Sequence, residues 1–313
     1  MSHTGIVYDD IFMQHETLPG HPERAERLGA ILDMLDATGL RDQLVWIEPR
    51  DATLGDLARI HEPHYVDFVR QAVAAGENML DLGDTCVGPH SYAAALKAAG
   101  AVLEAIDAVA RGEIRNAFCP VRPPGHHACM ARAMGFCLFN NVAIGVRYAQ
   151  TVHRLEKVLV VDWDVHHGNG SQEAFYSDDT VFLVSLHQAP HFPGTGAATQ
   201  TGYGRGIGHT LNIPMRRGSG DAEFRAVFQS VIEPRADAFE PDLVLVSAGF
   251  DGHTADPLSG LELSSEFYGE MTRIVRGIAE RHAGGRLVSV LEGGYNLKAL
   301  ADSVEAHLRA LMA

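Results

Sequence analysis

The sequence has few cysteines, no long apolar run and no secretion signal. It holds four cysteines in 313 residues, none of them in C-x-x-C spacing, which predicts reduced thiols rather than a disulfide framework. No stretch reaches the roughly 18 uninterrupted apolar residues that a membrane span requires. The N-terminus, MSHTGIVYDD, lacks a cationic start followed by an apolar segment. We therefore expect a cytoplasmic protein with no membrane partner.

Positive charge is also scarce. Lysine and arginine together number 25 against 40 aspartate and glutamate residues, so the formal net charge is −15. Because non-specific nucleic-acid binding needs basic patches that displace counterions, we expect no nucleic-acid partner. An acidic surface suits cationic substrates, but it also simply keeps a protein soluble, so charge alone selects no function.

Linkers are absent as well. No Pro/Ser-rich tract, charge block or low-complexity segment divides the chain, and 46% of its residues are hydrophobic, enough for a large core. We therefore expect a single domain over residues 1–313. The composition is compatible with a homo-oligomer.

Short apolar runs alternate with amphipathic segments along the chain. Runs that do not alternate with polar residues are typical of strands buried on both faces, which predicts an α/β fold with a parallel sheet between helices. Ligands of such sheets bind beyond the carboxyl ends of the strands. The expected strands are GIVYDD, AFCPV, VLVVDWD, TVFLVSLH, HTLNIPM, DLVLVSAGFD and RLVSVLEGGY, and the expected helices include 22–37, 63–74, 92–110, 142–152 and 222–239.

The segment VDWDVHHGNG ends one of these runs with acidic and histidine side chains. Side chains in a strand alternate faces, so Asp162, Asp164 and His166 share one side. The segment indicates a metal site at the end of a buried strand; the alternative for this segment alone is capping carboxylates and satisfied polar histidines at a strand end. Three more expected strands, however, lead into reactive residues at the same edge: His126 with His127, Asp251, and Tyr295.

Together these residues suit metal-assisted amide hydrolysis. Asp164, His166 and Asp251 would supply three ligands to Zn²⁺ and leave one position for water, and Fe²⁺ or Co²⁺ also suits such a donor set. Histidine titrates near neutral pH, so His126 and His127 are candidates for general base and acid. Tyr295, which follows two glycines, is a candidate to stabilise the tetrahedral oxyanion.

The motifs RPPGHHA, GFCLFNN, VDWDVHHGNG, VSLHQAPHFPGTG, AGFDGHTADPL and LEGGYN stand in an order that resembles the zinc-dependent histone deacetylases. The resemblance is closest to the class II enzymes and the bacterial histone-deacetylase-like amidohydrolases. It implies the arginase/deacetylase fold, with a parallel sheet of about eight strands and helices on both faces. It also implies removal of acyl groups from lysine side chains with the help of Zn²⁺.

The resemblance assigns roles to individual residues. It identifies Asp164, His166 and Asp251 as the zinc ligands, Asp162 as the carboxylate that orients His126, and Asn169 as the partner of His127. Class I relatives have aspartate in place of Asn169. An amide stabilises imidazolium less than a carboxylate does, which predicts a lower pKa for His127. By the same matching, His126, His127 and Tyr295 are catalytic; Gly135, Phe136, Phe192, Leu258, Asp84 and Arg27 contact substrate or product; and Asp162, Ser185 and Leu186 belong to a monovalent-cation site suited to K⁺.

Three other functions remain open. An acetylpolyamine deacetylase would use the same chemistry on a different amine. An arginase-like hydrolase would need a second metal with bridging carboxylates, yet His253 stands two residues after Asp251 where another aspartate would be expected. A non-catalytic acyl-lysine binder would be expected to have lost a ligand or Tyr295.

Overall fold

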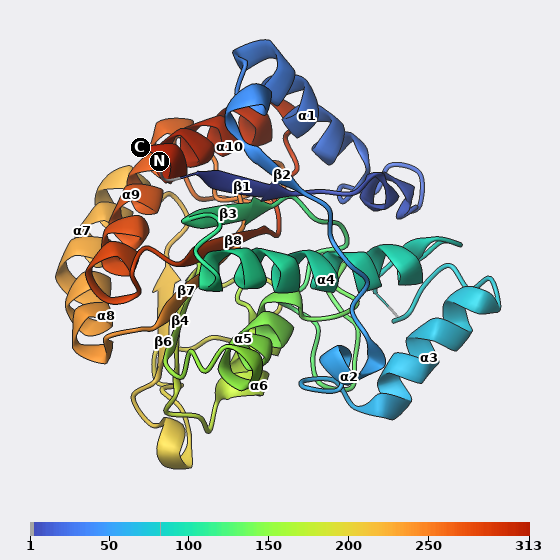
Figure 1. The fold of residues 1–313 in the computed structure, drawn as a ribbon, viewed down its shortest axis with the longest axis horizontal. Coiled ribbons are helices and arrows are strands. Elements are labelled where there is room, and N and C mark those ends of the chain that lie inside the picture. The colour runs from blue at the N-terminus through green and yellow to red at the C-terminus, as the bar shows by residue number, and fades with distance from the viewer. Residues whose placement is uncertain (1–2, 82) are drawn as a thin grey trace.

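Eight parallel strands form one sheet in the computed structural model, which describes residues 3–81 and 83–313 (Figure 1). The order across the sheet is β2-β1-β3-β8-β7-β4-β5-β6. This confirms the predicted parallel α/β sheet. The strands are β1 Thr4–Val7, β2 Val45–Ile47, β3 Asn116–Cys119, β4 Val158–Asp162, β5 Val181–Gln188, β6 Thr210–Met215, β7 Leu243–Ala248 and β8 Leu287–Leu291.

Helices cover both faces of the sheet. On one face α4 packs against β1, β3 and β8, α5 against β7, and α6 against β5; on the other, α10 packs against α1, α9 and β3 (Figure 1). The helices are α1 Glu26–Thr38, α2 Leu54–Leu57, α3 Pro63–Ala74, α4 Ser91–Ala110, α5 Asn141–Val152, α6 Asn169–Phe175, α7 Asp221–Val227, α8 Glu233–Phe239, α9 Ser265–His282 and α10 Leu297–Met312. No helix among the described residues is long and apolar enough to cross a bilayer.

Two of the predicted helices differ from the observed ones. The helix expected from residue 22 begins at Glu26, because Glu23 is buried in ion pairs instead of opening a helical turn. The helix expected over 222–239 consists of α7, a π-helical segment at Phe228–Ile232, and α8.

The strand order gathers the reactive loops. Strands β3, β8, β7 and β4 are consecutive neighbours in the sheet, and all their carboxyl ends meet at one edge because every pairing is parallel. The loop after each of these strands carries one of the predicted reactive segments. Their convergence therefore follows from the topology.

Candidate active site

Asp164, His166 and Asp251 form a buried cluster at this edge. Each offers one ligand atom, and the three atoms lie within 4.8 Å of one another. His166 Nδ1 is 2.9 Å from Asp164 Oδ1 and 3.2 Å from Asp251 Oδ2. The loops after β4 and β7 supply the cluster, and the pairing of Asp162 with Ser247 sets their relative position.

The surroundings of this cluster fit a bound metal ion. Backbone N–H groups of Val165 and Gly293 donate to Asp251 Oδ1 and Asp164 Oδ2, at 2.9 and 2.8 Å. These bonds fix both carboxylates and leave their other oxygens facing His166, as outer-shell partners of metal ligands do. Asp251 Oδ2 is buried and accepts no hydrogen bond from the described residues. Because a buried carboxylate oxygen without a hydrogen-bond partner is costly, this donor set suits a cation.

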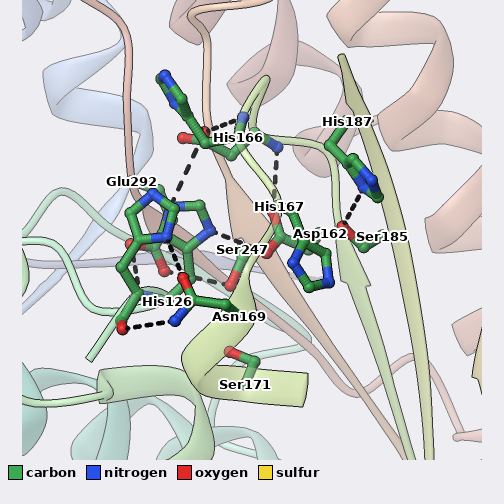
Figure 2. A network of polar contacts seen from close by, with 12 residues as sticks. His126, Asp162, His166, His167, Asn169, Ser171, Ser185, His187, Ser247 and Glu292 are labelled. Atoms are coloured by element: carbon green, nitrogen blue, oxygen red, sulfur yellow. Dashed lines mark hydrogen bonds and ion pairs between the residues drawn. The ribbon is translucent and has the colours of Figure 1, made fainter. Parts of the chain in front are cut away.

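The tandem histidines stand beside the cluster with different partners. His126 Nδ1 donates to Asp162 Oδ2 at 2.9 Å, and His126 Nε2 is 3.8 Å from Asp164 Oδ1. Burial opposes protonation of His126, but the charges of Asp162 and Asp164 outweigh it and raise the pKa of the imidazole well above its usual value. Figure 2 shows His126 and Asp162 within one network of polar contacts.

His127 bonds to an amide instead. His127 Nδ1 donates to Asn169 Oδ1 at 2.8 Å. The orientation of the Asn169 amide follows from its other contacts, because Nδ2 faces the His127 carbonyl oxygen and the sulfurs of Cys129 and Met134. The pKa of His127 is lowered well below its usual value, first by burial and then by the charge of His126. The hydrogen bond to Asn169 acts in the opposite direction and raises this pKa, so burial and the neighbouring imidazoles cause the lowering. The predicted effect of asparagine relative to aspartate at this position stays a prediction.

A buried glutamate fixes the loop that carries both histidines. Glu292, at the end of β8, accepts the backbone N–H groups of Gly125 and His126 on Oε2, and the hydroxyl of Ser247 donates to its Oε1. Burial, its largest cause, raises the pKa of Glu292 to about 7. The sequence contains LEGGY but gives no local signal for this bond, which spans 167 positions.

The Tyr295 loop is held from two sides. Asp256 Oδ2 accepts the backbone N–H of Tyr295 at 2.7 Å, and Arg27 donates to the carbonyl oxygens of Gly294 and Glu292, both at 2.6 Å. The Arg27 guanidinium also lies 5.1 Å from the centroid of the Tyr295 ring. Burial, then the charges of Asp251 and Asp164, raise the pKa of the Tyr295 phenol well above its usual value. The phenol therefore keeps its proton.

These groups open into one cavity of about 420 Å³. Both predicted aromatic walls line it, and Phe192 is 42% exposed at the mouth. The Phe192 ring meets the His127 ring edge to face, with 5.2 Å between centroids. The lining residues are His21, Pro22, Asp84, Pro124, His126, His127, Gly135, Phe136, His166, His191, Phe192, Leu258, Gly293 and Tyr295.

Close packing explains the glycine before Phe136. A Cβ at Gly135 would lie 2.4 Å from His127 Cδ2, and the backbone there has φ of +57°. Phe136 itself has φ of 69°, which is uncommon for a residue with a bulky side chain. Its ring contacts those of Tyr295 and His21, with centroids 6.0 and 4.6 Å apart. The strained turn thus aims Phe136 into the cavity.

Some predicted site residues lie outside the cavity. Arg27 is fully buried behind Tyr295 and does not line the cavity. Asp162, which accepts the His126 proton, is paired with Ser185 across β4 and β5, next to Leu186. The Ser185 hydroxyl contacts His187 Nδ1 at 3.0 Å (Figure 2).

Sequence reasoning missed several residues of the site. His191 stacks on His166, with centroids 4.9 Å apart and an interplanar angle of 17°, and contacts the Leu258 carbonyl oxygen through Nε2 at 2.9 Å. His21 meets the Asp84 carbonyl oxygen at 3.1 Å. His191 belongs to the motif VSLHQAPHFPGTG, and His21 begins the segment HPERAERL, but spacing alone does not show where either ring points.

Comparison with known proteins agrees with this geometry. Residues 21–311 match the family model described as the histone deacetylase domain. A histone deacetylase-like amidohydrolase of Pseudomonas aeruginosa is 41% identical over 91% of this chain and 75% of its own length. Human histone deacetylase 9 is 39% identical over 99% of this chain, which spans only 34% of that longer protein. The crystal structure of the HDA15 HD domain superposes with a TM-score of 0.95 at 38% identity, covering 99% of this chain and 88% of that one.

Proposed function

The chain belongs to the histone deacetylase family, beside its class II members and the bacterial histone-deacetylase-like amidohydrolases, and on that premise we propose that it removes acyl groups from lysine side chains with Zn²⁺ as cofactor. Membership makes it a hydrolase of amide bonds. The observation that carries the finer proposal is the cavity whose inner end holds a buried Asp-His-Asp cluster, two histidines and a tyrosine.

Asp164, His166 and Asp251 would hold the metal ion. Bound there, Zn²⁺ would polarise the amide carbonyl and lower the pKa of a water molecule beside it. Burial of all three side chains supports this assignment, since a low local dielectric strengthens every interaction with a cation.

His127 is the proposed general base. Its Nδ1 proton is committed to Asn169, so Nε2 is the nitrogen left to take a proton from the attacking water. The same nitrogen then passes that proton to the departing amine. His126, held by Asp162, supplies a second imidazole at the reacting centre.

Tyr295 is the proposed oxyanion donor. Its high pKa keeps the phenol protonated, and a donor aimed at the developing oxyanion stabilises the transition state more than the substrate. Asp256 and Arg27 support the backbone on either side of it. Arg27 thus serves as a positioning residue in this scheme, while its predicted contact with departing acetate stays a prediction.

The aliphatic lysine chain would occupy the cavity. Gly135, Phe136, Phe192 and Leu258 form apolar walls, as ligand sites for alkyl chains do. Asp84 lies at the same cavity and is half-buried, so it is the proposed acceptor for the substrate backbone.

An acetylpolyamine is the second candidate substrate, since it would place the same amide at the same atoms. The arginase-like alternative has less support, because only one group of three metal-binding side chains occurs among the described residues. A non-catalytic binder would not need His127 in the one tautomer that the hydrogen bond to Asn169 fixes. K⁺ beside Asp162, Ser185 and Leu186, and a cytoplasmic location, stay predictions of the sequence.

Hydrolysis assays test the proposal directly. Purified protein reconstituted with Zn²⁺ is given an acetyl-lysine peptide, an acetylpolyamine and a longer acyl-lysine peptide, and the released amine is measured. We expect the acetyl-lysine peptide to be cleaved and a chelator to abolish cleavage. Faster turnover of the acetylpolyamine would favour the second candidate, and full activity in metal-stripped protein would exclude the metal mechanism.

A further inference from the structure

A second cavity of about 830 Å³ adjoins the first. His191 and Leu258 line both cavities, and His191 Nε2 lies 2.9 Å from the Leu258 carbonyl oxygen. A substrate whose acyl-lysine occupies the first cavity therefore has neighbouring groups within reach of the second. Its lining residues are Gln188, Ala189, Pro190, His191, Arg216, Arg217, Pro257, Leu258 and Ser259.

The charged side chains of this second cavity are Arg216 and Arg217. Both are exposed, and within residues 3–81 and 83–313 neither guanidinium has a carboxylate at ion-pair distance. Two adjacent cations without counterions stand out in a chain of net charge −15. Guanidinium groups bind carboxylates through paired hydrogen bonds.

The backbone around these arginines is fixed by hydrogen bonds. The Gly218 N–H donates to the Gly260 carbonyl oxygen at 2.7 Å, and the Gly260 N–H donates to Gln188 Oε1 at 2.7 Å. Gly260 also makes room for the Arg217 side chain, since a Cβ there would lie 2.5 Å from Arg217 Nη1. The end of β5 and the loops after β6 and β7 are thereby joined next to the two arginines.

The first cavity has an acidic residue at its mouth. Asp84 lines that cavity but not the second, and burial together with the charge of Asp81 raises its pKa. The first cavity therefore has a carboxylate in its lining, and the second cavity has two guanidinium groups. A substrate complementary to both would be polar along its length.

We propose that the cavity lined by Arg216 and Arg217 is a subsite for a carboxylate that the substrate carries next to its acylated lysine. The inference rests on the proposed deacetylase function and names its substrate class. The carboxylate belongs either to an aspartate or glutamate side chain or to the free α-carboxyl group of a terminal acyl-lysine. The net charge of the protein repels acidic peptides, so this local cationic site is what would select them.

Matched peptides test the subsite. In the first set, an acetyl-lysine peptide carries Glu, Gln or Lys at a position beside the acetyl-lysine. In the second set, the peptide ends at the acetyl-lysine, as either the free acid or the amide. The readout is the ratio of kcat/KM between the acidic and neutral members of each pair. We expect a ratio of about five in favour of the carboxylate at low salt, shrinking as ionic strength rises. The peptide pair that shows the ratio identifies the source of the carboxylate.

Variants distinguish the effect of the two arginines from the effect of the overall electrostatic field of the protein. Combined Arg216→Gln and Arg217→Gln should bring the ratio to about one, and Arg217→Glu should favour the Lys peptide over the Glu peptide. Arg273→Gln, an exposed charge change on α9, should leave the ratio as it is. Binding of the same labelled peptides to Tyr295→Phe protein, followed by fluorescence anisotropy, gives the ratio in Kd even where turnover is slow.

A ratio near one in both peptide pairs, or a ratio that survives the double substitution, would overturn the inference. Failure of the proposed function looks different, because no neutral acetyl-lysine peptide would then be hydrolysed. The anisotropy measurement still decides on the subsite in that case.

Discussion

The amide oxygen of Asn169 accepts the Nδ1 proton of His127 at 2.8 Å, while the Asn169 amide nitrogen faces the His127 carbonyl oxygen. One side chain thus fixes both the tautomer and the backbone of the proposed base. Removing its oxygen should free the ring to adopt either tautomer, so Asn169→Ala should lower kcat about tenfold.

Asn169→Asp tests the same pair by changing charge alone. A carboxylate still accepts the proton but favours imidazolium, so the pKa of His127 should rise from its lowered position. The base form is then reached only at higher pH, and the acidic limb of the pH profile of kcat/KM should move upward. An unshifted limb would show that His127 does not set it.

Tyr295→Phe removes one hydroxyl and keeps the ring in contact with Phe136. If the phenol meets only the developing oxyanion, kcat should fall by about 10²–10³ with little change in KM. Metal content, measured by elemental analysis, should not change. Wild-type turnover would make Tyr295 a structural residue.

Asp251→Ala should prevent metal binding, since it removes the oxygen that lacks a hydrogen-bond partner. Because a bound ion stabilises only the folded state, a chelator should lower the Tm of wild-type protein by about 5 °C. The same chelator should not shift the Tm of Asp251→Ala. Asp179→Ala, which removes a surface carboxylate paired with Arg205, should retain the ion and its stabilising effect.

Gly135→Ala should disable the site without unfolding the protein. Its Cβ would lie 2.4 Å from His127 Cδ2, so the imidazole must move and kcat/KM should fall at least about tenfold. Gly39→Ala is the matched control, because Gly39 has φ of +66° with nothing within 4 Å of the added Cβ. It should cost about 1 kcal/mol of stability and leave kcat/KM intact.

The buried ion pair of Glu23 and Arg122 should matter for stability. Burial opposes ionisation of Glu23, but the charge of Arg122 outweighs it and lowers the pKa of the carboxyl to about 2. Glu23→Gln leaves Arg122 and Arg27 without this counterion and should cost about 3–5 kcal/mol.

The pH dependence of unfolding checks that pair independently. A carboxyl whose pKa is lower in the folded state contributes stability above its unfolded pKa and loses it as pH falls toward its folded pKa. Wild-type protein should therefore lose stability between about pH 5 and 2, and Glu23→Gln should lose less over that interval. Equal losses in both proteins would show that other carboxyl groups dominate.

Apolar runs and glycine-punctuated loops allowed much of the fold to be predicted from sequence. The strand β2 was missed because it has three residues at the sheet edge and its Trp46 is 37% exposed. The helix α6 was missed because it is seven residues long and begins inside the motif at Asn169. Short elements of this kind depend on their neighbours, so their local sequences carry little signal.

The candidate site was likewise predicted only in part. Asp164, His166 and Asp251 were predicted together because parallel strands bring their ends to one edge, and the cluster confirms that they meet. Glu292, Asp256 and His191 were not predicted, because their roles depend on bonds to backbone groups of distant loops. The roles of the predicted residues in catalysis stay predictions until they are measured.

The position of β8 in the sheet has a consequence for folding during synthesis on the ribosome. Residues Leu287–Leu291 pair with β3 on one side and β7 on the other, so the sheet stays in two halves until β8 has been synthesised. Both halves expose an unpaired interior edge during that time, which is a hazard for aggregation. Insertion of β8 closes both edges and delivers Glu292 and Tyr295 to the site in the same event. A nascent chain therefore completes the proposed active site and closes its two interior sheet edges in one and the same step.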